Sequence, residues 1–86
     1  MKYQARFTTE ARDELRRIDR KTALAILHKL AELEQDPMGY ATTPVVTRPG
    51  HRRLRVGDYR VIYRVDQGAL VVLVVHVGHR ATVYDD

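Results

Sequence analysis

The chain of 86 residues contains no cysteine. This absence excludes disulfide bonds, thiolate metal sites and cysteine nucleophiles, and it fits a reducing compartment, so we expect a cytoplasmic protein. The four histidines are not spaced as a pair of ligands on one helix. The sequence therefore predicts no metal site, and we expect no cofactor.

Long apolar runs are also missing. No run reaches the ~18 to 20 residues that a membrane-spanning helix needs, and the amino terminus has no continuous apolar segment after its first charge. We therefore expect no membrane association and no secretory signal. With 44% hydrophobic and 30% charged residues, the composition is that of a globular protein, and no linker or repeat divides it. Residues 1–86 are predicted to form a single domain.

Positive charge, in contrast, is concentrated in one part of the chain. Six of the 15 basic side chains lie in a stretch of 17 residues, and they are Arg48, Arg52, Arg53, Arg55, Arg60 and Arg64. Subtracting the only acid of that stretch, Asp58, leaves +5, which exceeds the formal charge of +4 for the whole chain. Because the rest of the chain is close to neutral, this pattern favours a localised site for phosphate groups.

The first half of the chain has a strand followed by two helices. Alternating apolar and polar side chains predict a strand over residues 3–7. Thr8 or Thr9 is expected to cap a short helix, and Asp19 a second helix that ends before Pro37. The apolar stripes at helical spacing are Ala11, Leu15 and Ile18 in the first helix, and Ala23, Ile26, Leu27, Leu30 and Leu33 in the second. Residues 38–50 are expected to form an irregular connection.

The second half is predicted to be β structure. Strands over residues 51–56 and 59–65 flank a tight reversal at residues 57–58, and a third strand over 69–77 is apolar on both faces, as expected beside the first strand. Alternation places two sets of side chains on a shared basic face, and they are His51, Arg53 and Arg55 from one strand, and Arg60, Ile62 and Arg64 from the next. Tyr59 and Tyr63 point the other way, toward the core.

The predicted fold is therefore α+β, with the order β-α-α-β-β-β. An antiparallel sheet carries the αα-hairpin on one face, and its other face is basic. Because the helices bury only one side of the sheet, the arginines of the other side must face solvent, anions or a partner.

Two motifs resemble the RelE/ParE toxin superfamily, and the resemblance spans essentially the whole chain. They are Asp58-Tyr-Arg-Val-Ile-Tyr63 and Gly78-His-Arg-x-x-Val-Tyr84. The resemblance implies a bacterial toxin of a type II toxin–antitoxin system with a RelE-like fold, held inactive by a cognate antitoxin. RelE-like members cleave messenger RNA in the ribosomal A site, and they do so without a metal.

The resemblance also implies site residues. The family's basic pair on the second strand falls on Arg53 and Arg55, the arginine on the third strand on Arg60, and the later arginine and tyrosine on Arg80 and Tyr84. We assign catalysis to Arg53, Arg60, Arg80 and Tyr84, with Arg60 and Arg80 clamping the phosphate and Tyr84 as the base. The RNA-binding residues are predicted to be Arg48, His51, Arg52, Arg55, Arg64 and His79.

The sequence departs from the family pattern at the second strand, where the best-known member carries lysines and this chain has Arg53 and Arg55. Arginine does not deprotonate, so it is a poor proton donor and no base. His51 and His79 are possible replacements because histidine titrates near neutral pH. His76 is predicted to be a satisfied residue of the sheet rather than a catalyst.

Three functions stay open at this point. The first is a ribosome-dependent endoribonuclease, with the ribosome and mRNA as partners. The second is a ParE-like inhibitor of DNA gyrase that is not a nuclease. The third is an inactive relative kept for binding its antitoxin. If the chain is a nuclease or a gyrase inhibitor, its antitoxin is expected to be acidic where it covers the basic face. Operator DNA is expected to be bound only through the antitoxin.

Overall fold

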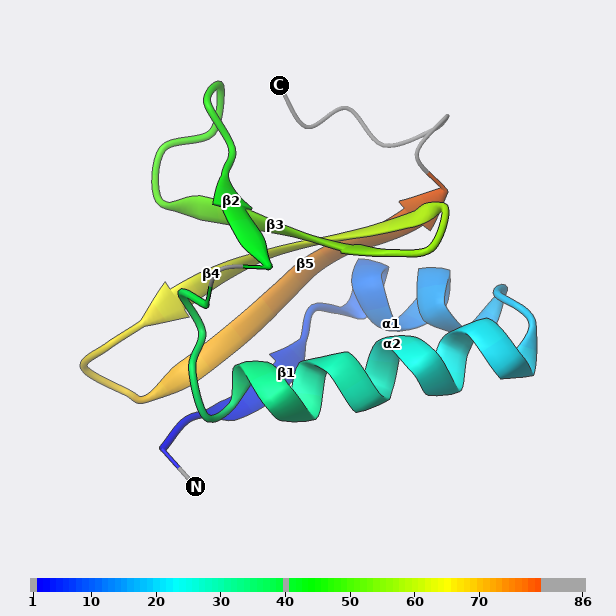
Figure 1. Cartoon of the computed structure of the whole chain (residues 1–86), viewed down its shortest axis with the longest axis horizontal. Helices are drawn as coiled ribbons and strands as arrows, with labels where there is room; N and C mark the ends of the chain where they lie inside the picture. The colour runs from blue at the N-terminus through cyan, green and yellow to red at the C-terminus, as the bar shows by residue number, and fades with distance from the viewer. Residues whose placement is uncertain (1, 40, 80–86) are drawn as a thin grey trace.

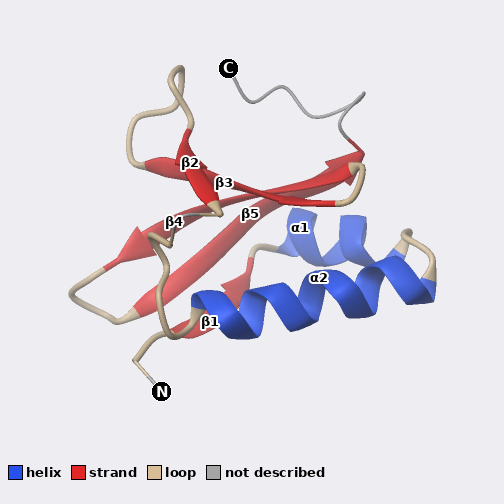
Figure 2. Ribbon diagram, viewed as in Figure 1, coloured by secondary structure: helices blue, strands red, loops and turns tan. Residues whose placement is uncertain are grey.

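The computed structural model describes residues 2–39 and 41–79. The elements are β1 (Gln4–Phe7), α1 (Thr9–Arg16), α2 (Arg20–Leu33), β2 (Thr42–Pro44), β3 (His51–Val56), β4 (Tyr59–Asp66) and β5 (Val71–His79). The strands form one sheet in the order β1-β5-β4-β3-β2. Both helices cover the same face of this sheet (Figures 1 and 2). The predicted α+β class, the paired helices and the place of β5 beside β1 are confirmed.

Two details of the predicted sheet are wrong. The sheet is mixed and not wholly antiparallel, because β1 pairs in parallel with β5, with Gln4 opposite Val71. The two strands are far apart in the sequence, so no hairpin turn fixes their relative direction. The connection over residues 38–50 also contains a strand, β2, in which Thr42 lies opposite Leu54 of β3. A strand of three residues is too short to show a pattern of alternation.

The helices begin where the sequence predicts. The Thr8 hydroxyl accepts a hydrogen bond from the Ala11 amide at 3.1 Å, and the Asp19 carboxylate accepts one from the Thr22 amide at 3.1 Å. The apolar stripe of α2 is narrower than expected, because Leu27 is 42% exposed. In the described part of the chain, no helix is both long enough and apolar enough to cross a membrane.

The core lies between the helices and the sheet. Its buried members are Ala11, Ile26, Leu30, Leu33, Leu54, Val61, Tyr63, Val72, Val74 and Val77. Tyr63 is 0% exposed, and its hydroxyl donates to the Pro37 carbonyl oxygen at 2.6 Å. Both tyrosines of β4 point toward the helices as predicted, since Tyr59 packs against the same core. The opposite face of β3 and β4 is therefore left for the charged side chains.

Glutamates at both helices satisfy amides at the edge of the sheet. The Ala5 amide of the edge strand β1 donates to the Glu34 carboxylate at 2.7 Å, and the Tyr3 amide donates to the Glu34 carbonyl oxygen at 2.9 Å. Where β1 ends, the Thr8 amide still bonds to the carbonyl of Val74 in β5. Beyond that point α1 supplies the acceptor for an amide of β5, because the Glu14 carboxylate accepts a hydrogen bond from the Val77 amide. These contacts protect strand edges that would otherwise expose unpaired amides.

Candidate nucleic-acid interface

The basic face is formed by the side chains of His51, Arg53, Arg55, Arg60 and Arg64, on the side of the sheet that the helices leave open. In the pairing of β3 with β4, His51 lies opposite Arg64, Arg55 opposite Arg60, and Arg53 opposite Ile62. Residues that are directly opposed in a sheet share a face. The alternate pair, Leu54 and Val61, is buried in the core beneath the helices. The sequence-based assignment of these five residues to one face is thus consistent with the register.

Arg55 and Arg60 are two like charges in one row of the basic face. Directly opposed side chains in an antiparallel pair have Cβ atoms about 4.5–5.5 Å apart, and like charges at this spacing repel. The neighbour of Arg60 on its other side is Gly78, which carries no side chain. Gly78 itself therefore adds no side chain to this row.

Two members of the basic face are held by short contacts to the segment before β3. An Arg53 guanidinium nitrogen donates to the Thr43 hydroxyl at 3.1 Å. The His51 Nδ1 atom lies 3.3 Å from the Pro49 carbonyl oxygen. The strand β2 and its loop therefore position these side chains, which is a role that the sequence did not suggest for residues 38–50.

Three predicted RNA-binding residues lie outside the basic face. Arg52 is opposite Tyr63, on the helix side, and its guanidinium donates to the Thr42 hydroxyl at 2.9 Å. His79 is opposite Tyr59, and the two rings meet edge to face with centroids 5.5 Å apart. Arg48 belongs to the turn before β3, where its amide donates to the Val45 carbonyl. The predicted catalytic residues Arg80 and Tyr84 lie outside the residues that the structure describes.

A cavity of about 720 Å³ opens at the His51 end of the basic face. Its walls combine polar and apolar side chains, and among them are His51, Arg64, Asp66, Pro44 and Leu73. The volume falls in the range of about 300–1,000 Å³ that is typical of small-molecule sites. Such walls suit a ligand that joins an anionic group to an apolar ring, as a nucleotide does.

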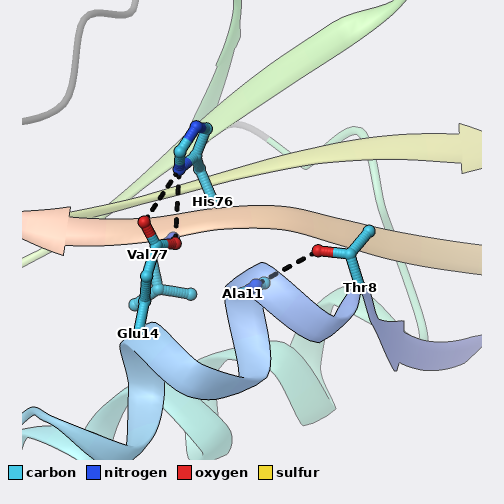
Figure 3. Close-up of polar contacts among 5 residues, drawn as sticks. All are labelled: Thr8, Ala11, Glu14, His76 and Val77. Atoms are coloured by element: carbon cyan, nitrogen blue, oxygen red, sulfur yellow. Dashed lines mark hydrogen bonds and ion pairs between the residues drawn. The ribbon is translucent and has the colours of Figure 1, made fainter.

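A polar cluster joins α1 to the far end of β5 (Figure 3). The two carboxylate oxygens of Glu14 lie 3.2 and 3.1 Å from His76 Nδ1, and one of them accepts from the Val77 amide at 2.9 Å. His76 is thus satisfied, as the sequence analysis predicted, although its side chain stays 42% exposed. Sequence spacing alone does not reveal this pair, because 62 residues separate its members. Within residues 2–39 and 41–79, no group of three acidic, histidine or cysteine side chains is placed to hold a metal ion.

Comparisons with known proteins agree with this architecture. A family model described as "ParE toxin of type II toxin-antitoxin system, parDE" matches residues 5–84. Toxin RelG of Mycobacterium tuberculosis is 31% identical over 85 residues, which make up 98% of this chain and 98% of that protein. The family match and this relative both cover nearly the whole chain.

Solved structures show the same fold. A chain of the toxin–antitoxin complex RelBE2 from M. tuberculosis superposes with a TM-score of 0.81 and 30% identity, covering 93% of this chain and 100% of that one. The isolated RelE toxin of E. coli gives a TM-score of 0.80 and 25% identity, over 90% of this chain and 83% of that one.

Proposed function

The chain belongs to the ParE toxin family of type II toxin–antitoxin systems, within the RelE/ParE superfamily, and we propose that it is a ribosome-dependent endoribonuclease that cleaves mRNA in the A site. The observation that carries the proposal is the direct opposition of Arg55 and Arg60 on the open face of the sheet. Two arginines that are opposed in one row, with Gly78 next to them, support a site for a phosphodiester, because guanidinium groups bind phosphate oxygens strongly.

The proposed reaction depends on fixed cations beside the scissile phosphate. The 2′-hydroxyl of the nucleotide before the scissile bond attacks the phosphorus atom, and the 5′-oxygen leaves in line with it. Negative charge develops on the phosphate oxygens during this step, so fixed cations beside them lower the barrier. A guanidinium group holds two phosphate oxygens at once through its planar fork, which serves both positioning and charge stabilisation.

Individual roles follow from position in the sheet and from the family pattern. Arg60 is the central clamp, because Arg55 and Gly78 flank it in one row of the open face. Arg53 lies in the adjacent row, opposite Ile62, and is proposed as a further catalytic cation from its place in the family pattern. Arg80 is proposed as the second clamp and Tyr84 as the base that removes the 2′-proton. These last two roles rest on the family pattern.

The partners of the proposed toxin are the ribosome with its mRNA and a cognate antitoxin. Three of the similar solved structures, from E. coli, Pyrococcus horikoshii and Methanococcus jannaschii, are complexes of a RelE toxin with a RelB antitoxin. An antitoxin over the basic face is expected to be acidic, because desolvating several guanidinium groups without counter-charges is costly. Operator DNA is reached through the antitoxin, and the protein acts in the cytoplasm, where ribosomes are.

The test is to induce the chain in growing bacteria and to map new mRNA ends against ribosome positions. We expect cuts within A-site codons and arrested growth. The Arg60→Gln variant, and the Arg80→Ala, Tyr84→Phe double variant, are expected to relieve the arrest while still binding antitoxin. Arg12→Gln removes the same charge from the exposed side of α1 and is expected to remain toxic. Full arrest by the double variant, or growth arrest without cut messages, would contradict the proposal.

Inhibition of DNA gyrase is the second candidate, and the matched family model, described as a ParE toxin, favours it. A gyrase inhibitor has no need for cations that converge on a single phosphodiester. The same induction experiment separates the two functions, because gyrase inhibition elicits a DNA-damage response with intact messages. That outcome would replace the nuclease with this alternative.

A further inference from the structure

The proposed nuclease lacks an evident proton donor for the oxygen that leaves the phosphate. The arginines of the basic face stay protonated and are poor donors. The histidines suggested by the sequence are less well placed, since the His79 ring meets Tyr59 edge to face on the helix side and His51 contacts the Pro49 carbonyl at the end of β3. The remaining histidine of the sheet, His76, has different surroundings.

His76 lies on the open face, in the row next to that of Arg60. It is directly opposite Ile62 of β4, while Arg60, two residues earlier on the same strand, is opposite Gly78. Such diagonal neighbours lie about 7–8 Å apart, which is within reach of an arginine side chain. A phosphodiester held by Arg60 over Gly78 would therefore lie beside the His76 ring.

Glu14 fixes both the orientation and the tautomer of this ring. A carboxylate accepts hydrogen bonds and cannot donate them, so its contacts of 3.1 and 3.2 Å assign a proton to His76 Nδ1. In Figure 3 the ring stands on the side of β5 away from α1, and its second nitrogen, Nε2, is directed away from Glu14. Glu14 is itself held, because it also accepts from the Val77 amide at 2.9 Å. Nε2 is thus the ring nitrogen that Glu14 does not contact.

We propose, on the basis of the nuclease function above, that His76 is the general acid of the reaction and that Glu14 is its positioning residue. As the bond between the 2′-oxygen and phosphorus forms and the bond to the 5′-oxygen breaks, the Nε2 proton passes to the 5′-oxygen. The 2′-proton goes to the base, and the products are a 2′,3′-cyclic phosphate and a 5′-hydroxyl. Water then reprotonates the side chain, which is 42% exposed.

The test uses purified chain, programmed ribosomes and two mRNAs, one natural and one with sulfur replacing the bridging 5′-oxygen at the cut site. A thiolate leaves without a proton, so the sulfur substrate needs no general acid. The main variant is His76→Asn, whose amide nitrogen can still donate to Glu14 but which has no Nε2 proton. It is expected to lower the single-turnover rate on the natural mRNA by about 100-fold or more, and to cleave the sulfur substrate at nearly the parent rate.

Two further variants separate catalysis from folding. Glu14→Gln keeps an acceptor for one of the two donors, so we expect a loss of about tenfold on the natural mRNA and little on the sulfur substrate. His28→Gln changes a histidine on α2 whose side chain is 79% exposed, and it is expected to match the parent on both. Thermal unfolding of each variant confirms that the fold is kept.

Three outcomes would overturn the assignment. A parent-like rate of His76→Asn on the natural mRNA removes the role outright. An equal loss on both substrates shows that His76 supports binding or structure and is not the acid. If the parent chain cleaves neither mRNA, the nuclease function itself fails, and this role fails with it.

Discussion

At the scale of the residue, Tyr63 shows how a polar atom is kept in the core. Its ring is 0% exposed, and its hydroxyl donates to the Pro37 carbonyl at 2.6 Å. Burial raises the pKa of the Tyr63 phenol above its ordinary value of about 10, because the phenolate would lose its hydration. The folded chain therefore binds this proton more tightly than the unfolded chain does.

This difference predicts a loss of stability in alkali. The contribution of Tyr63 to the free energy of unfolding is fully present below about pH 10 and is lost as the pH rises through the folded pKa. In urea unfolding between about pH 8 and 11, the parent is expected to lose stability more steeply than Tyr63→Phe. The variant is expected to cost about 1 kcal/mol at neutral pH for its lost hydrogen bond. Parallel pH curves for the two proteins would contradict this account.

Asp19 predicts the opposite behaviour in acid. The Thr22 amide donates to its carboxylate and lowers the pKa of Asp19. Stability from a lowered pKa is present above the unfolded value of about 3.9 and is lost as the pH falls through the folded pKa. Asp19→Asn keeps a good capping residue but cannot titrate, so its unfolding free energy is expected to fall less between about pH 5 and 2. Identical acid slopes in parent and variant would show that the cap does not carry this dependence.

At the scale of the element, the free edge of β1 depends on the end of α2. Glu34 accepts from the Ala5 amide at 2.7 Å through its side chain. Glu34→Ala is expected to lower the free energy of unfolding by about 1–2 kcal/mol, and Glu34→Gln by less, since an amide oxygen still accepts. Urea unfolding measures both. The matched control is Glu32→Ala, whose carboxylate meets His28 and Lys29 on the surface, with an expected change below about 0.5 kcal/mol. Equal losses in the two alanine variants would contradict the edge role.

Local pattern predicted most of the elements, and long-range pairing set the parts that it missed. The caps at Thr8 and Asp19 and the alternation along β3 and β4 are properties of neighbouring residues, so they can be read from the sequence. The parallel pairing of β1 with β5 joins the two ends of the described chain, and no local signal gives its direction. The short strand β2 is defined by its pairing with β3, which lies several residues further along the chain.

The same distinction applies to the candidate site. Alternation was enough to place the basic face, because its members lie on two strands joined by a turn of two residues. Arg52 and His79 do not belong to the basic face, because alternation points both side chains toward the helix side. There the Arg52 guanidinium donates to the Thr42 hydroxyl, and the His79 ring contacts Tyr59. The contact between Glu14 and His76 arises only when α1 packs against the end of β5. Pairwise contacts of this kind require the folded chain.

At the scale of the whole molecule, one face of the sheet is covered by helices and the other concentrates positive charge. The antitoxin complex is therefore expected to weaken with salt, its dissociation constant rising about tenfold or more between about 50 and 500 mM salt. The Arg55→Gln, Arg64→Gln double variant is expected to flatten this dependence, as titration calorimetry can show. An Arg12→Gln, Arg16→Gln pair on α1 serves as the charge-matched control. A salt-independent affinity of the parent would contradict an acidic contact over the basic face.

The central claim, that the opposed arginines stabilise charge on a phosphodiester, is tested most directly by the single-turnover rate of A-site cleavage on purified ribosomes. We predict that the parent cleaves, that Arg55→Gln, Arg60→Gln cleaves at least about 100-fold more slowly, and that Arg12→Gln, Arg16→Gln matches the parent. A parent-like rate of the Arg55→Gln, Arg60→Gln variant would contradict the claim.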